Sequence, residues 1–157
     1  KADVPLVGAH RIEGVEVLVA QGRTPMGSAF AMARQWLEDK ELVPSRAYRP
    51  VLVLVSDGEP TDDWQEPLAA LKASERGQKA TRFAMAIGAD ADRAMLRQFT
   101  NDLEAPVFEA DGVRDIVKFF RAVTMSVMAR STSGSPNTAQ PLGMSDDLED
   151  DLDLDAL

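Results

Sequence analysis

Two apolar runs dominate the hydrophobic pattern of this chain. Residues 51–55 are all valine or leucine, and residues 81–87 form a second, largely apolar run that ends at Gly88. An uninterrupted apolar run is typical of a strand that is buried on both faces, as in the middle of a parallel α/β sheet. We therefore predict that residues 51–55 form the central strand of such a sheet and that residues 81–87 form a second strand.

Segments with apolar residues at helical spacing alternate with these strands. The pattern predicts extended segments over residues 14–20 and 106–110 and helices over residues 25–40, 64–76, 92–100 and 113–128. The helix over residues 64–76 is expected to stop at Gly77. In the last helix the predicted buried stripe consists of Val113, Ile116, Phe120, Val123 and Val127. This alternation favours an α/β fold with a Rossmann-like, mostly parallel sheet that is flanked by helices.

Charge is distributed unevenly along the 157 residues. The chain has 17 Lys and Arg, 26 Asp and Glu and a net charge of −9, and every cation precedes Ser131. We therefore predict a folded domain over residues 1–130, a flexible linker over residues 131–143 and a disordered acidic tail over residues 144–157. An alternative for the tail is that its leucines dock onto a partner.

Composition excludes several classes of function. The absence of cysteine excludes a disulfide scaffold, a thiolate zinc site and cysteine catalysis. The chain offers no basic face for a phosphate backbone, so we expect no nucleic-acid partner. No apolar run approaches the roughly 20 residues that span a bilayer, and no signal peptide is visible. We therefore expect a cytoplasmic protein without a membrane partner.

The loop after the first apolar strand carries the clearest candidate chemistry. Asp57 follows the strand directly, and Gly58 lets the backbone turn. Ligands of open α/β sheets bind at the carboxyl ends of strands, and a carboxylate there suits a hard cation. Asp57 can also be an ordinary turn residue, although its position favours a site. Glu59, Asp62 and Asp63 either bind a second cation or lie in a solvated loop in which Asp62 or Asp63 caps the helix near Trp64, and we favour the cap.

A second candidate, Thr24, lies in the turn before the first helix. Thr24 precedes Pro25, and this pair is typical of a helix N-cap followed by the first helical residue. Thr24 can therefore cap the helix, offer its hydroxyl to a metal ion, or do both.

Both turns resemble metal loops of von Willebrand factor type A (vWA) domains. Residues 22–29, Gly-Arg-Thr-Pro-Met-Gly-Ser-Ala, resemble the second metal loop of that family. Residues 53–62, Val-Leu-Val-Ser-Asp-Gly-Glu-Pro-Thr-Asp, resemble the third. The resemblance covers about residues 15–128 and implies a metal-ion-dependent adhesion site (MIDAS). It implies that the Thr24 hydroxyl and Asp57, directly or through a water, bind Mg²⁺, with Mn²⁺ or Ca²⁺ as alternatives.

Within that family, residues 56–64 and 119–123 most resemble the TerY-like bacterial subgroup, which is linked to tellurium-resistance and stress operons. The first motif of the family, Asp-x-Ser-x-Ser, has no counterpart here, so we expect that the amino-terminal part of a vWA domain is missing from this chain. The resemblance implies a module that is not an enzyme and that binds a protein partner through a carboxylate which the partner supplies to the metal.

Two alternatives stay open at the level of sequence. An aspartate after a buried strand is also the nucleophile of aspartyl-phosphate enzymes and of receiver-like domains, and Asp57 would then be phosphorylated. Haloacid-dehalogenase-type phosphatases have Asp-x-Asp at that point, which this chain lacks, and the strand over residues 81–87 ends without the lysine of receiver domains. The other alternative is a structural remnant that pairs with a second chain.

Overall fold

The computed structural model of this chain describes residues 22–100 and 107–134. Within them, a three-stranded parallel sheet with the order β1-β2-β3 consists of β1 (Val51–Ser56), β2 (Thr81–Ile87) and β3 (Phe108–Ala110). The helices are α1 (Met26–Glu38), α2 (Gln65–Ala73), α3 (Glu75–Lys79), α4 (Arg93–Phe99) and α5 (Val113–Thr132). The predicted α/β fold with a parallel sheet is therefore confirmed. The extended segment over residues 14–20 and the acidic tail lie outside the described residues.

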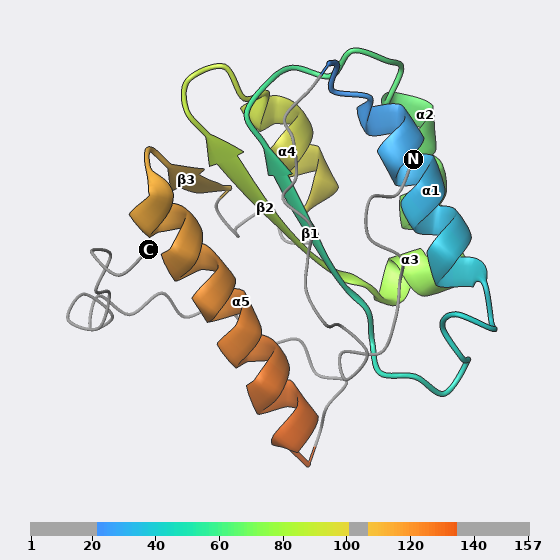
Figure 1. The fold of residues 1–157 in the computed structure, drawn as a ribbon. Coiled ribbons are helices and arrows are strands. Elements are labelled where there is room, and N and C mark those ends of the chain that lie inside the picture. Colours follow the sequence, from blue (N-terminus) through green and yellow to red (C-terminus); the bar gives the residue numbers. More distant parts are fainter. Residues whose placement is uncertain (1–21, 101–106, 135–157) are drawn as a thin grey trace.

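The helices cover the two faces of the sheet unequally, as Figure 1 shows. Helices α1, α2 and α4 pack on one face, in a core that includes Phe30, Leu71 and Met95. Helix α5 packs on the other face, where its Phe119 belongs to the same cluster as Met85 of β2. None of the helices in the described part of the chain combines the length and the apolar character that crossing a bilayer requires.

Strand β2, rather than β1, is central among the described strands. Val51 of β1 pairs with Thr81 of β2, and β3 pairs with the other side of β2. Residues 51–55 are only half-buried, whereas residues 82–86 are buried. The prediction that residues 51–55 form a central strand buried on both faces is wrong for the described sheet, because no described strand pairs with the outer edge of β1.

Ser74 divides the helix that we predicted over residues 64–76. Helix α2 ends at Ala73, and the Ser74 hydroxyl accepts a hydrogen bond of 3.2 Å from the Gly77 N–H, which caps α3. Gly77 therefore lies inside α3, and the prediction that it stops the preceding helix is wrong. A Cβ at Gly77 would collide with the carbonyl oxygen of Leu71, so this glycine is needed where α3 packs against the end of α2.

The buried side of α5 also differs from the prediction. Ile116 and Val123 pack against the sheet as predicted, together with Phe119. Three members of the predicted stripe are exposed instead: Val113, Phe120 and Val127. The helix carries apolar residues at helical spacing on two of its sides, and the prediction combined positions from both. Helix α5 continues through Thr132, two residues into the predicted linker, whose remainder is only described as far as residue 134.

Candidate functional site

The turn before α1 and the loop after β1 meet at the edge of the sheet where the strands end, which we call the carboxyl edge (Figure 1). The Thr24 carbonyl oxygen accepts hydrogen bonds of 2.9 Å from the Thr61 N–H and 2.9 Å from the Met26 N–H. The Thr24 hydroxyl oxygen lies 3.7 Å from the position that a Cβ on Gly58 would occupy. The structure therefore brings together the two turns from which the predicted metal ligands come.

The side chains of Thr24 and Asp57 are not engaged with other described residues. Thr24 is half-buried and Asp57 is exposed, and neither side chain makes a hydrogen bond or an ion pair with another residue in the described ranges. Helix α1 begins at Met26 with Pro25 at its N-cap position and no side-chain cap from that residue. The alternative that Thr24 caps this helix is therefore wrong, and the metal-binding alternative stays a prediction.

Asp62 caps α1 from a distant part of the chain. Its carboxylate oxygens accept hydrogen bonds from the Gly27 N–H at 2.8 Å and from the Ser28 N–H and hydroxyl at 2.9 and 3.0 Å. First-turn amides have no partner inside their own helix, and the positive end of the helix dipole favours a carboxylate. Our prediction that Asp62 or Asp63 caps the helix near Trp64 is wrong, because α2 has no side-chain cap.

These hydrogen bonds also favour the ionised form of Asp62. Partial desolvation alone would raise the pKa of its carboxyl group, but the hydrogen bonds from Gly27 and Ser28 outweigh this effect and lower the pKa from its ordinary value. Sequence reasoning missed this role because the partners are 35 residues apart, and no local spacing connects them. Because both carboxylate oxygens of Asp62 accept these hydrogen bonds, a second cation at Asp62 is not favoured.

Gly27 permits the close contact between the two turns. A Cβ at this position would collide with the carbonyl oxygen of Asp63 and would lie 3.3 Å from a carboxylate oxygen of Asp62. The glycine in the turn motif is thus required by the packing of the loop after β1 against the start of α1. The close approach that it permits places Thr24 beside that loop, where the Thr24 carbonyl oxygen accepts the hydrogen bond from the Thr61 N–H.

Ser56 shapes the turn that carries Asp57. Its buried hydroxyl donates a hydrogen bond of 3.0 Å to the Gly58 carbonyl oxygen and accepts one of 3.4 Å from the Gly58 N–H. Both bonds join Ser56 to Gly58 across Asp57, so the backbone bends at Asp57. The carboxylate of Asp57 is therefore exposed at the carboxyl edge while the neighbouring polar groups are satisfied within the turn.

The end of β2 is occupied by an ion pair instead. The Arg93 guanidinium donates two hydrogen bonds, of 3.1 and 2.7 Å, to the Glu109 carboxylate and further bonds to the carbonyl oxygens of Gly88, Ala89 and Ala91. The hydrogen bond to Glu109 raises the pKa of Arg93 above its ordinary value. Arg93 and Glu109 are therefore paired with each other at this strand end, unlike Asp57.

The donor atoms at the end of β1 fit a hard cation in kind. Hydroxyl and carboxylate oxygens are the ligands that Mg²⁺ prefers, usually alongside several retained waters. In the part of the chain that the structure describes, no group of three or more His, Cys, Asp or Glu side chains converges on one point. Thr24 and Asp57 would therefore supply part of a coordination shell and leave the rest to water or to other groups.

These features define an open α/β domain whose candidate ligands follow the carboxyl end of a parallel strand, where such domains commonly bind their ligands. The sequence profile of the von Willebrand factor type A domain matches residues 11–122, a range that includes Thr24 and Asp57. The chain therefore belongs to the vWA domain family, whose members are generally metal-dependent protein-interaction modules. No curated protein and no solved structure matches the chain.

Proposed function

We propose that this vWA domain is a binding module, not an enzyme, and that it attaches to a protein partner through a divalent cation. The Thr24 hydroxyl and the Asp57 carboxylate would hold the ion, which we take to be Mg²⁺, with Mn²⁺ or Ca²⁺ as alternatives. One observation carries the proposal: Asp62 and Gly27 fix the two turns against each other, while the Thr24 and Asp57 side chains contact no hydrogen-bonding partner among the described residues.

The charges of the two candidate ligands suit an acidic partner. Thr24 contributes no charge and Asp57 contributes one negative charge, so a bound Mg²⁺ would keep a net positive charge and attract a further carboxylate. In this proposal Thr24 and Asp57 position the cation at the carboxyl edge. We propose that the partner supplies the carboxylate and that a loop resembling Asp-x-Ser-x-Ser, absent from this sequence, completes the shell.

We further propose a biological setting for the module. The likeness of residues 56–64 and 119–123 to TerY-like proteins supports a cytoplasmic role in a bacterial stress or tellurium-resistance system. Sequencing of the genes that flank this one would test the setting. If no tellurium-resistance or stress genes lie nearby, this assignment fails, whereas the proposal of a cation site is unaffected.

Manganese titration followed by electron paramagnetic resonance tests the cation site, because the signal of hydrated Mn²⁺ falls when the ion binds protein. We expect weak binding by this chain, since two ligands do not enclose a strongly hydrated ion. The variants Asp57→Asn and Thr24→Val should each lower the affinity by about tenfold or more. Glu59→Gln is the matched control, because Glu59 is an exposed carboxylate in the same loop.

Three results would count against the proposal. An equal loss of affinity in Glu59→Gln and Asp57→Asn would show that Mn²⁺ is attracted only by the acidity of the loop. Tight binding by the unmodified chain would contradict the incomplete ligand set. For the acidic partner, a poly-glutamate peptide should bind in Mg²⁺ and be released by a chelator, and binding that ignores the chelator would exclude a bridging cation.

A further inference from the structure

Helix α5 carries a second apolar row on a side that does not face the sheet. Val113, Phe120 and Val127 recur at helical spacing along this row. Their exposed fractions are 64, 44 and 38 %, and Met128, on the adjacent side of the helix, is 62 % exposed. Large apolar side chains that gather on one side of a surface helix usually mark a contact with another segment or protein.

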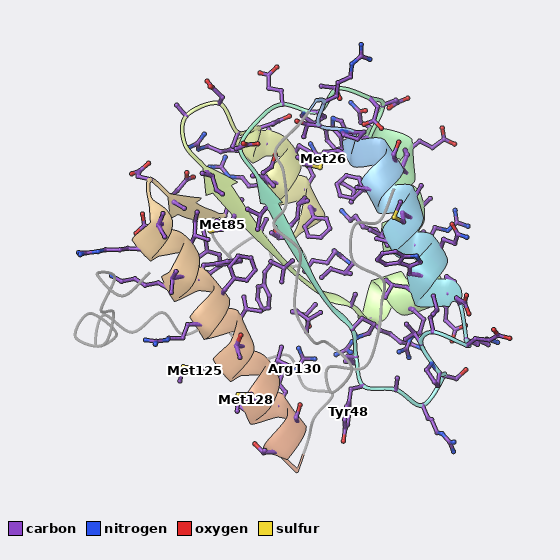
Figure 2. The ribbon with its side chains drawn as sticks, viewed as in Figure 1. Met26, Tyr48, Met85, Met125, Met128 and Arg130 are labelled. Atoms are coloured by element: carbon purple, nitrogen blue, oxygen red, sulfur yellow. The ribbon has the colours of Figure 1, made fainter. Side chains whose placement is uncertain are left out.

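A basic row runs beside the apolar row. Arg114, Lys118 and Arg121 are spaced by four and three residues, which places them on one side of the helix. Met125 continues this row, and Figure 2 shows it projecting from α5 away from the strands. Helix α5 contains four cations and a single carboxylate, Asp115, in a chain whose net charge is −9. This helix is therefore a locally positive region of an acidic protein.

A small pocket lies where α5 approaches the start of β1. Its volume is about 40 Å³, and it is lined by Tyr48, Arg49, Val51, Val127, Arg130 and Ser131. A single water needs about 10–15 Å³ by a comparable measure, so the pocket has room for a small side chain. Figure 2 shows Tyr48 and Arg130 at this end of the molecule. The Arg130 guanidinium donates a hydrogen bond of 3.2 Å to the Thr81 hydroxyl, which fixes one wall of the pocket.

The chain contains a segment whose chemistry complements this surface. Residues 146–157 hold seven carboxylates and four leucines without a cation. Helix α5 has 20 residues and is about 30 Å long. The 13 residues that connect Thr132 to Asp146 can extend over about 40 Å, enough to bring the segment back along the helix. A connection of this length also gives the segment an effective concentration of about millimolar.

We propose that residues 146–157 bind to α5 of the same chain. Their leucines would cover the apolar row, with one side chain in the pocket, and their carboxylates would lie beside the basic row. A partner protein or a second copy of the chain would have to compete with the tethered segment. This docking surface is separate from the cation site. The pocket lies at the start of β1, whereas Thr24 and Asp57 lie near the other end of that strand.

A spin label on the tail tests the proposal in the full chain. The chain has no cysteine, so Ala156→Cys provides a single attachment point for a nitroxide. We expect the label to broaden the amide signals of α5 and of Tyr48 and to spare those of α1, which packs on the opposite face of the sheet. Replacing Leu148, Leu152 and Leu154 by Ser in the labelled chain should lower the ratio of bound to free segment by more than about tenfold, because each leucine loses its apolar burial.

Two neighbouring positions of α5 supply a matched pair of variants. Met128→Asp and Ala129→Asp add the same charge at exposed positions, and the two side chains are about 100° apart around the helix. We expect Met128→Asp to reduce the broadening of α5 signals and Ala129→Asp to leave it unchanged. Helical content measured by circular dichroism should be the same in both. Equal effects of the two variants would show that charge alone, rather than the apolar row, governs the contact.

Other outcomes would overturn the proposal outright. If labelled chains broaden the α5 signals of separate, isotope-enriched chains in a mixture, the occupant is a second copy and not the tail of the same chain. If the broadening centres on residues 22–25 and 57–63, the acidic segment lies at the carboxyl edge. If no signal broadens beyond those next to the label, the segment does not dock on the domain.

Discussion

The two ends of the described sheet use charged side chains in opposite ways. Near the starts of the strands, Arg76, Arg82 and Arg130 are buried, with 8, 7 and 5 % exposed. At the carboxyl edge, Asp57 is exposed, and Asp62 instead makes the hydrogen bonds that hold the turns together. At the carboxyl edge, therefore, the Asp62 carboxylate holds the turns in place, and the Asp57 carboxylate makes no hydrogen bond with another described residue.

Arg82 illustrates the structural use of charge. Its guanidinium donates hydrogen bonds of 2.7 Å to the Phe99 carbonyl oxygen and 2.8 Å to the Gly77 carbonyl oxygen, so one side chain joins β2 to the ends of α3 and α4. Burial lowers the pKa of Arg82 from its ordinary value, which shows the cost of placing this cation in the interior. The hydrogen bonds to the two backbone carbonyl groups offset part of that cost.

The largest loss of stability is expected for Arg82→Met. Methionine keeps the apolar part of the side chain but leaves the carbonyl groups of Phe99 and Gly77 without this donor, which we expect to lower the free energy of unfolding by about 3 kcal/mol. Urea denaturation measures the change. Arg97→Met is the control, because Arg97 is exposed on α4, and it should change stability by less than about 0.5 kcal/mol. Similar losses in both variants would contradict a special role for Arg82.

A smaller loss is expected for Gly27→Ala at the carboxyl edge. The added methyl group meets the Asp63 carbonyl oxygen, so the loop must move away from α1, at a cost of about 2 kcal/mol. The same shift should weaken Mn²⁺ binding, because it separates Thr24 from Asp57. Gly58→Ala is the control for stability, since its Cβ would make an ordinary contact of 3.7 Å with the Thr24 hydroxyl. A stable Gly27→Ala variant would mean that the two turns adapt freely.

Asp62→Asn should have a smaller effect that depends on pH. Because the pKa of Asp62 is lower in the folded state than in the unfolded state, its stabilising effect is complete at neutral pH and is lost as the pH falls through the folded-state pKa. The unfolding midpoint of the unmodified chain should therefore fall in acid below about pH 4. Asp62→Asn should be less stable at pH 7 and should fall less steeply in acid. An unchanged slope would assign the acid sensitivity to other groups, with Asp63→Asn as the control.

The smallest effect on stability is expected for Asp57→Asn. Asp57 is exposed and its side chain makes no hydrogen bond with another described residue, so the free energy of unfolding should change by less than about 0.5 kcal/mol. The same variant is expected to cause a clear loss of Mn²⁺ binding. A measurable loss of stability in a metal-free buffer would show that Asp57 supports the fold and would weaken the distinction between the two ends.

The parts of the fold that were predicted correctly depend on local signals. The apolar runs that become β1 and β2 and the start of α5 at Val113 are visible in short windows of sequence. The capping of α3 by Ser74 was missed because its partner Gly77 looked like a helix stop. The buried side of α5 was misassigned because apolar residues occupy two sides of one helix, and only contact with β2 decides between them.

The candidate site shows the same division between local and distant signals. That Asp57 would lie at the carboxyl edge followed from its position after an apolar strand, and the meeting of the two turns is now observed. The metal-binding role of Thr24 and Asp57 stays a prediction. The hydrogen bonds of Asp62 to the start of α1 had no signal in the sequence, since they depend on how the loop after β1 packs against Gly27.

The exposed methionines of α5 make one side of this helix chemically vulnerable. Met125 and Met128 are 57 and 62 % exposed, whereas Met85 and Met95 are fully buried. Oxidants such as peroxide convert an accessible thioether to a polar sulfoxide, a change that reductases can reverse. Mild oxidative stress would therefore alter the surface of α5 before it reached the methionines of the core, and the domain would remain folded while the character of that surface changed.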